Sequence, residues 1–445
     1  MMCRREQRQE RQKRGAIRSP LLVRLCALCA LCALCGSSVV TPTPLSAQGP
    51  AACTMQLDSV GGVARQVEIA PGVVHTYAGG GVWASCRGRP LSLRADSAAW
   101  YSERDKVDFI GRVHFRDSTA TLDSRTATYF PRDERLEAYG DVRLVNLETG
   151  SQLDGPALIY WREAPGMRDT AEILATSRPT VRYRSASDTA AEPYVIVGQQ
   201  VRLRGSDRTW AGGNVTIERS DFASRSDSAE LDLGAGRGAF LGHAEVQGRG
   251  ENQYTLAGRT IVFRLDGNKL TWVQAQGAGD ATSKDWRLSA DTIAFDIVNQ
   301  QIERGTAWGD SSRPSALSER HTMRADSVAL DTPGQQLEEL RGYGDAVATA
   351  ARDSLDGQPD WVAGDSLVAR FDTTSAGERI LTSLEARGGA RTYYRVYEAD
   401  GVTLAGINYS RGKHIVAAFD ERGVRRVRVL GEGDGVYLEP IPKRP

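Results

Sequence analysis

The stretch "LRADSAAWYSERDKVDFIGRVHF", residues 93–115, contains a unit that returns along most of the chain. It begins with Ala-Asp-Ser and a short apolar run, passes through a polar turn, and ends in a second apolar run that contains a glycine. The beginning of the unit recurs, with changes, as "DSRTATYF" (123–130), "SRSDSAELD" (224–232), "LAGRTIVFR" (256–264), "LSADTIAFD" (288–296), "MRADSVALD" (323–331) and "VAGDSLVARF" (362–371). Such self-similarity is typical of proteins built from stacked repeats.

The serine or threonine of each unit defines a column of equivalent positions. Its members are Ser97, Thr126, Ser228, Thr260, Thr292, Ser327 and Ser366. Neighbouring members are 29 to 39 residues apart, except for one gap of 102 residues between Thr126 and Ser228. Two degenerate copies, "LDGPALIYW" (153–161) and "IVGQQVRLR" (196–204), fall within that gap.

Apolar and polar residues alternate within each copy. In residues 326–331, Val328 and Leu330 share one face, and small or polar residues share the other. Alternation with a period of two over short runs separated by turns predicts β-strands, whereas no helical pattern occurs after the first 47 residues.

A hairpin of this length cannot bury its apolar face alone, so neighbouring units must stack. A recurring glycine fits a bend where the chain folds over. It stands at Gly111, Gly140, Gly213, Gly242, Gly309 and Gly344. The sequence therefore predicts an all-β fold, an elongated stack of antiparallel β-hairpins.

Residues 1–47 have the pattern of a signal peptide. They hold eight basic and two acidic residues, and the apolar run "LCALCALCALC" (25–35) is too short to span a bilayer. Cleavage after Ala47 would give an exported mature protein with Gln48 at its N-terminus; the alternative is an uncleaved membrane anchor. The rest of the chain carries 48 basic and 54 acidic residues, a mildly acidic balance that argues against nucleic acid as a partner.

Two of the seven cysteines, Cys53 and Cys86, lie outside this predicted signal peptide. An even pair in an exported protein is a candidate disulfide. The alternative is two unpaired thiols.

The tetrapeptide Gly-Asp-Ser-Leu at 364–367 resembles the signature of a family of serine hydrolases. A catalytic serine needs one positioned base, usually histidine, and no Asp-x-x-His follows this motif. Because Ser366 also stands in the repeated hydroxyl column, we interpret it as a structural residue near the start of a strand.

The five histidines include no pair at metal-ligand spacing, and we expect neither a metal site nor a cofactor. The aspartates before the hydroxyl column are interpreted as solvated turn residues.

The apolar face of the stack is the remaining candidate for a function. If the hairpins stack without closing, their inner faces line a groove, which is either a packed core or a site for acyl chains. Each buried methylene contributes about 0.8 kcal/mol, so a lipid can be held with no catalytic residue. The candidate groove residues are Ile261, Phe263, Ile293, Phe295, Val328, Leu330, Leu367 and Ala369.

The units have the form Ala-Asp-Ser/Thr-x-x-Tyr/Phe, followed by apolar-x-Ala-x-Gly-x-Val, and they resemble the OstA-like lipopolysaccharide-transport family. "GGGVWASCRGRPLSLRADSAAWY" (79–101) is similar to the opening strand and first repeat of that family, and the resemblance covers roughly 75–430. It implies a β-jellyroll, or β-taco, that passes lipid A of lipopolysaccharide along its interior. It also implies edge-strand pairing with inner-membrane and outer-membrane transport components, and head-to-tail self-association.

The chain is longer than a simple bridge protein of that family, which suggests two jellyrolls in tandem. We expect halves at 48–185 and 195–430, a linker around "RSASDTAAEP" (184–193), and a C-terminal tail at 431–445. The predicted function is non-enzymatic carriage of lipopolysaccharide or a related glycolipid toward the outer membrane. The rivals are a structural or adhesive β-solenoid at the cell surface and the serine hydrolase.

Overall fold

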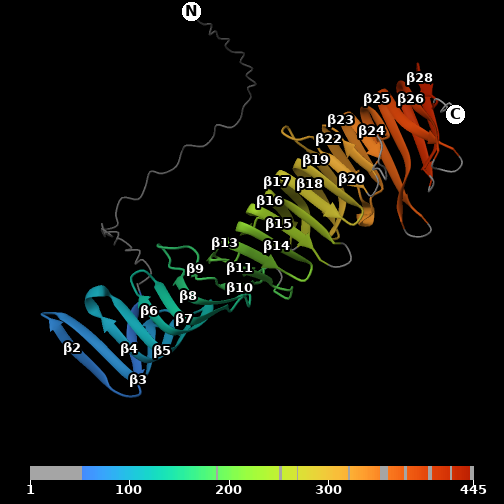
Figure 1. The fold of residues 1–445 in the computed structure, drawn as a ribbon. Coiled ribbons are helices and arrows are strands. Elements are labelled where there is room, and N and C mark those ends of the chain that lie inside the picture. The colour runs from blue at the N-terminus through green and yellow to red at the C-terminus, as the bar shows by residue number, and fades with distance from the viewer. Residues whose placement is uncertain are drawn as a thin grey trace, which may run out of the picture. The chain divides into compact units, whose positions relative to one another are not determined.

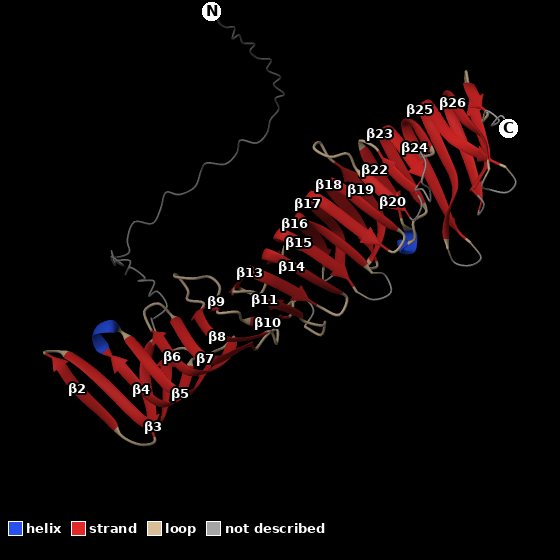
Figure 2. Cartoon of the chain, viewed as in Figure 1, coloured by secondary structure: helices blue, strands red, loops and turns tan. Residues whose placement is uncertain are grey.

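The computed structural model describes residues 53–186, 189–249, 253–267, 269–318, 321–350, 359–374, 378–398, 403–420 and 423–440. These residues form 28 β-strands and two short 3₁₀ turns, η1 (Ser102–Arg104) and η2 (Pro333–Gln335) (Figure 2). The predicted signal peptide lies outside the described residues. The all-β prediction is confirmed: every strand pairs antiparallel with its neighbours in one sheet.

Sixteen strands are long, and each runs across the full width of the sheet. They are β3 (Val73–Arg87), β4 (Ser92–Tyr101), β5 (Lys106–Arg116), β6 (Ala120–Phe130), β7 (Arg135–Asn146), β8 (Gln152–Trp161), β13 (Arg208–Glu218), β14 (Phe222–Asp232), β15 (Arg237–Gly248), β16 (Tyr254–Asp266), β17 (Lys269–Ser283), β18 (Trp286–Val298), β23 (Glu339–Ala350), β24 (Trp361–Thr373), β25 (Arg379–Tyr397) and β26 (Leu404–Asp420). Figure 1 shows them following one another in chain order.

Twelve shorter strands act in pairs, each pair taking the place of one long strand. They are β1 (Thr54–Val60), β2 (Ala64–Ala70), β9 (Glu172–Thr176), β10 (Thr180–Tyr183), β11 (Tyr194–Val197), β12 (Gln200–Arg204), β19 (Gln301–Trp308), β20 (Ser315–Ser318), β21 (His321–Arg324), β22 (Ser327–Asp331), β27 (Gly423–Leu430) and β28 (Asp434–Leu438).

Each long strand is divided by a shift in pairing register, and these shifts line up into a bend that separates two walls. In β4 the shift falls between Arg94 and Ser97. We call the side that contains 97–101 of β4 the first wall, and the side that contains 92–95 the second wall. At the bend, Gly111 and the following Arg112 both have positive φ, 77° and 42°. Glycine adopts this conformation without penalty, which explains its recurrence there.

The hydroxyl column is a physical row on the first wall, immediately after the bend. In the sheet, Ser97 pairs with Ile110 of β5, and Ile110 pairs with Thr126 of β6. The same succession of paired residues continues from strand to strand as far as Ser366. Six of these residues lie in the middle of long strands, because those strands continue through the bend, whereas Ser327 is the first residue of β22. Each hydroxyl therefore marks one layer of the stack, as the repeat predicts.

The predicted linker falls between β10 and β11, which pair directly with each other, so the sheet is continuous on both sides of it. Strands β9 and β12 pair in the first wall and β10 and β11 in the second, and all four connect β8 to β13. Two separate jellyrolls therefore stay a prediction. The stack also extends beyond 430, where the sequence predicts its end. Strand β28, within the expected tail, pairs with β26 because β27 covers only the first-wall half of that strand.

The core lies between the two walls. Phe109, Tyr129 and Leu136 of the first wall are fully buried, as are Leu93 and Phe115 of the second. The rings of Phe115 and Tyr160 meet edge to face across the interior, with centroids 5.8 Å apart. Side chains of both walls thus fill this part of the stack.

Candidate functional site

A cavity of about 230 Å³ lies between the two walls in the middle of the stack. Strands β14 to β18 of the first wall contribute Leu231, Phe240 and Phe263 to its lining. The second wall contributes Phe222 and Tyr254 from the opposite side. Apolar side chains therefore surround a space that the core does not fill.

Two glycines create this space. A Cβ on Gly238 would clash with the Phe263 ring, and one on Gly248 would clash with the Tyr254 ring. Because these positions lack side chains, both aromatic rings lie against a neighbouring strand. The interior between the walls is left open.

Two of the predicted groove residues, Ile261 and Phe263, line the cavity. The other six are buried on the same wall but lie outside the cavity lining: Ile293, Phe295, Val328, Leu330, Leu367 and Ala369. Phe295 is only 1% exposed and packs on Trp286 of the opposite wall, with ring centroids 5.7 Å apart. A packed core therefore continues beyond the cavity.

The predicted set missed the entire second wall, including Phe222, Val246 and Tyr254. The bend is the reason. In β18 the inward residues are Leu288 and Ala290 before the bend, and Ile293 and Phe295 after it. The alternation changes phase there, so a period-two pattern extended from the hydroxyl column places second-wall residues on the wrong face.

Charged residues lie at the second-wall rim of the cavity. The Arg219 guanidinium forms an ion pair with Asp221, and its Nη1 donates to the Tyr194 hydroxyl at 2.8 Å. The hydrogen bond from Arg219 to Asp221 is the main reason that the pKa of Arg219 is raised. Burial, together with the charge of Asp221, raises the pKa of Tyr254 to about 12, so this hydroxyl is neutral at neutral pH. The rim is thus polar above an apolar interior.

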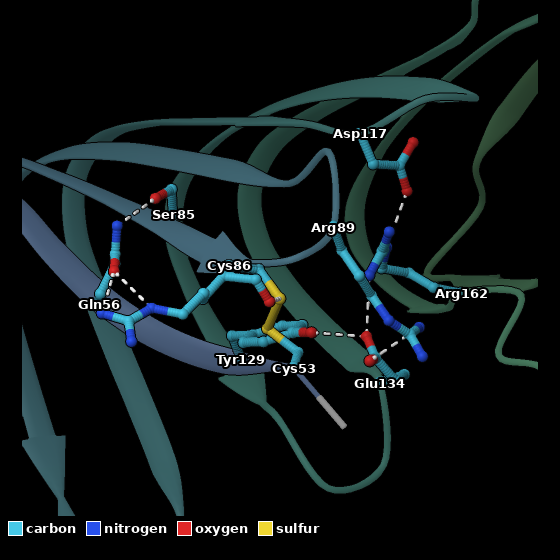
Figure 3. Close-up of a disulfide and its surroundings, with 10 residues drawn as sticks. Cys53, Gln56, Ser85, Cys86, Arg89, Asp117, Tyr129, Glu134 and Arg162 are labelled. Atoms are coloured by element: carbon cyan, nitrogen blue, oxygen red, sulfur yellow. Dashed lines mark hydrogen bonds and ion pairs between the residues drawn. A yellow bond between two sulfur atoms is a disulfide. The ribbon is translucent and has the colours of Figure 1, made fainter. Parts of the chain in front are cut away.

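A different arrangement occurs in the section between β3 and β8 (Figure 3). Arg162, after β8, contacts Asp117 in the β5–β6 turn, with 2.9 Å between Nε and Oδ2. Arg89, in the β3–β4 turn, contacts Glu134 in the β6–β7 turn, with 3.1 Å between Nη1 and Oε1. Both ion pairs join a turn of the second wall to an end of the first.

We call Arg89, Asp117, Glu134 and Arg162 the clasp. Arg162 also contacts Glu134, with 2.8 Å between Nη1 and Oε2. The side chains of Asp117, Glu134 and Arg162 are 2%, 4% and 7% exposed, so the central members are almost completely removed from water. Burial alone would lower the pKa of Arg162, but its hydrogen bonds to Asp117 and the neighbouring charges raise it overall.

Two tyrosine hydroxyls complete this network. Tyr129 donates to Glu134 Oε2 at 2.7 Å, and Tyr160 donates to Asp117 Oδ2 at 3.1 Å. Burial, reinforced by these carboxylates, raises the pKa of both tyrosines far above the usual value. Each central carboxylate therefore accepts from a guanidinium and a neutral phenol, as buried charges require.

Cys53 and Cys86 form a disulfide with 5.5 Å between their Cα atoms, the pair that the sequence predicts. Both belong to the second wall: Cys53 lies directly before β1, and Cys86 lies in β3. The bond attaches the first strand of that wall to the buried core, close to Tyr129 of the clasp network (Figure 3).

Ser366 has Tyr343 and Arg387 as its register partners. It therefore occupies the hydroxyl row in the same way as the six other members. Among the described residues, no group of three or more His, Cys, Asp or Glu could hold a metal ion, and no helix is long and apolar enough to cross a membrane.

No protein-family model and no curated protein matches the chain. Inference about function therefore rests on its own geometry. That geometry comprises an apolar cavity between two walls, a polar rim at the cavity, and a section closed by buried charges.

Proposed function

We propose that this protein is a periplasmic, non-enzymatic lipid carrier whose cavity holds acyl chains of lipopolysaccharide or a related glycolipid. The observation that carries the proposal is the apolar space between Phe263 and Tyr254, which opposite walls enclose without filling. A space lined by hydrophobic and aromatic side chains with polar groups at its rim is the usual form of a small-molecule site.

The energetics support an acyl chain as the occupant. Each methylene moved from water into such a space contributes about 0.8 kcal/mol, so even a partly inserted chain gains several kcal/mol. The polar head would lie at the rim, beside Arg219 and Arg249. The repeat pattern, which resembles the OstA-like lipopolysaccharide-transport family, favours a glycolipid over other amphiphiles.

The proposed partners are inner-membrane and outer-membrane transport components that pair with the end strands, and further copies joined head to tail. Among the described strands, β27 and β28 pair only with β26, so each has a free edge. Val436 and Leu438 of β28 are exposed there, and a free apolar edge supports pairing by strand addition.

A photocrosslinking experiment tests the lipid site. We expect p-azidophenylalanine at Phe263 to crosslink to purified lipopolysaccharide, because this ring lines the cavity. Phe263→Asp should abolish crosslinking from a second probe at Phe240. The control is Val262→Asp, a charge on the neighbouring residue, which lies outside the cavity lining. A charge at Phe295 is a poorer test, because that side chain is fully packed and a charge there would unfold the layer.

The structural scaffold remains a second candidate, favoured by the packed interior around Phe109 and Phe115. If no probe around the cavity crosslinks to lipid while the variants remain folded, the scaffold is the better account. The hydrolase is tested separately: esterase activity that Ser366→Ala abolishes would support it.

A further inference from the structure

The clasp is a costly arrangement that persists only because it is complete. Charges moved out of water lose several kcal/mol of hydration each, and their mutual attraction offsets this only with good geometry. Here Arg162 lies between two carboxylates, and each carboxylate also accepts from a tyrosine hydroxyl. Removing one partner would leave a buried charge without compensation.

The clasp also has a definite position relative to the interior. Its turns lie at the ends of the walls, opposite the bend, and it joins the walls above Tyr129 and Tyr160. The inward side chains of the section beneath it, such as Phe109, Phe115 and Leu136, are fully buried. Where the clasp is present, the two walls are therefore held together.

The section that contains the cavity lacks such a link. Arg219 and Asp221 belong to the same turn, and the contact between Arg249 and Glu218 joins the residue after β15 to the end of β13, both in the second wall. Among the described residues of β13 to β19, no ion pair joins the two walls. The packed layer of Phe295 and Trp286 also lacks one, so the cross-wall ion pairs distinguish the section from β3 to β8 rather than the cavity.

We propose that the clasp is a gate: it keeps the section from β3 to β8 closed, so that an acyl chain in the cavity advances toward the N-terminal strands only when the clasp opens. This inference rests on the proposed lipid-carrier function. In this proposal, the four clasp residues determine how far the lipid-binding interior extends toward the N-terminal strands.

The balance of forces makes such a gate responsive to lipid. Opening returns four charged groups to water and recovers their hydration, but it exposes the apolar side chains beneath them. An acyl chain that inserts between the walls covers that apolar surface. The closed state is thus favoured when empty and the open state when filled, which couples opening to lipid.

Matched crosslinking probes test this gate in the full chain. Phe109 lies beneath the clasp and Phe263 in the cavity, and p-azidophenylalanine adds only an azide to either ring. With purified lipopolysaccharide, we expect crosslinks from position 263 and background yield from position 109. In the Arg162→Met background, the yield at 109 should rise to that at 263. Arg112→Met, which removes an exposed ion pair with Asp96 at the bend, should change neither yield.

A second variant separates opening from misfolding. Asp117→Leu/Glu134→Leu/Arg162→Met replaces the central charges by apolar groups, and such replacements are often neutral or stabilising. It should remain closed, with background yield at position 109. Arg89→Met provides a milder opening if Arg162→Met does not fold, because Arg89, with 16% of its side chain exposed, is the least buried member of the clasp.

The outcomes distinguish the gate from the carrier. Crosslinks from both positions in the otherwise wild-type chain, or none at 109 in either opened variant, would overturn the gate and leave the carrier standing. No crosslink from any position would overturn the carrier. In that case the gate is tested without lipid, by the rate at which N-ethylmaleimide labels a cysteine at position 136. The rate should be higher in Leu136→Cys/Arg162→Met than in Leu136→Cys alone, and equal rates would overturn the gate.

Discussion

Gly111 lies beneath the side chain of Asp96, and a Cβ on this glycine would come within 3.0 Å of the Asp96 Cβ. The residue after the glycine, Arg112, returns to the same aspartate and places Nη2 2.7 Å from Oδ1. Asp227 covers Gly242 and contacts His243 in the same way. The aspartates that directly precede five of the seven hydroxyls are thus part of the bend rather than simple turn residues.

Gly111→Ala should destabilise the layer, because the new methyl group meets Asp96 and the backbone has φ +77°. The conformational part of this cost is about 1–3 kcal/mol. Gly72→Ala is the matched control: it has the same φ of +77° and no atom within 4 Å of the added Cβ. Hydrogen exchange of β4 and β5 for Gly111→Ala, and of β2 and β3 for Gly72→Ala, measures the two losses, and equal losses would show that the contact with Asp96 adds nothing.

Arg162→Met should lower the free energy of unfolding by about 3–5 kcal/mol, because it leaves two buried carboxylates without their shared cation. Arg125→Met, which breaks an exposed ion pair with Asp141, should cost less than about 1 kcal/mol. Denaturant unfolding compares the two. Similar small losses would mean that water reaches the carboxylates of the clasp.

Alkaline pH should weaken the section between β3 and β8. Below about pH 10, Tyr129 and Tyr160 are neutral in both the folded and the unfolded chain. Above it, the unfolded chain releases these protons first, because burial and the adjacent carboxylates raise the pKa of both tyrosines in the fold. Stability should then fall with rising pH by about 1.4 kcal/mol per pH unit for each tyrosine.

Denaturant unfolding as a function of pH measures this effect, with tyrosinate absorbance as a second signal. Tyr129→Phe/Tyr160→Phe should make the dependence above about pH 10 shallower. The buried Tyr183 and Tyr254, whose pKa values are also raised, account for the remainder. Tyr343→Phe, an exposed tyrosine in the hydroxyl row, should leave it unchanged. An unchanged slope after the double substitution would assign the alkaline loss to other groups.

The repeat made the fold predictable. Residues such as Ser97 and Ser366 recur because each layer makes the same bend. The sequence pattern of that bend therefore occurs many times in one chain, which makes it recognisable. The glycine of the bend was visible for the same reason. The division into two walls was not, because the phase change at the bend depends on two residues with positive φ, such as Gly111 and Arg112, rather than on hydrophobicity.

The site was only partly predictable. Ile261 and Phe263 follow from the first-wall alternation, but a cavity depends on where the core is left unfilled. That depends on Gly238 and Gly248, which carry no hydrophobic signal. The clasp was invisible because Arg89, Asp117, Glu134 and Arg162 lie in turns outside the repeated positions, and only the fold brings them together.

The final prediction concerns the disulfide. Its residues are 33 positions apart, and closing a loop of this length stabilises a protein by about 3–4 kcal/mol in the chain-entropy account. In a stack whose layers contact mainly their neighbours, the loss should stay local. Cys53→Ala/Cys86→Ala should therefore speed hydrogen exchange in β1 and the adjoining part of β3, and leave β14 to β18 at wild-type rates. Unchanged exchange in β1 would mean that pairing with β3 alone holds the first strand, whereas faster exchange throughout would contradict the nearest-neighbour character of the stack.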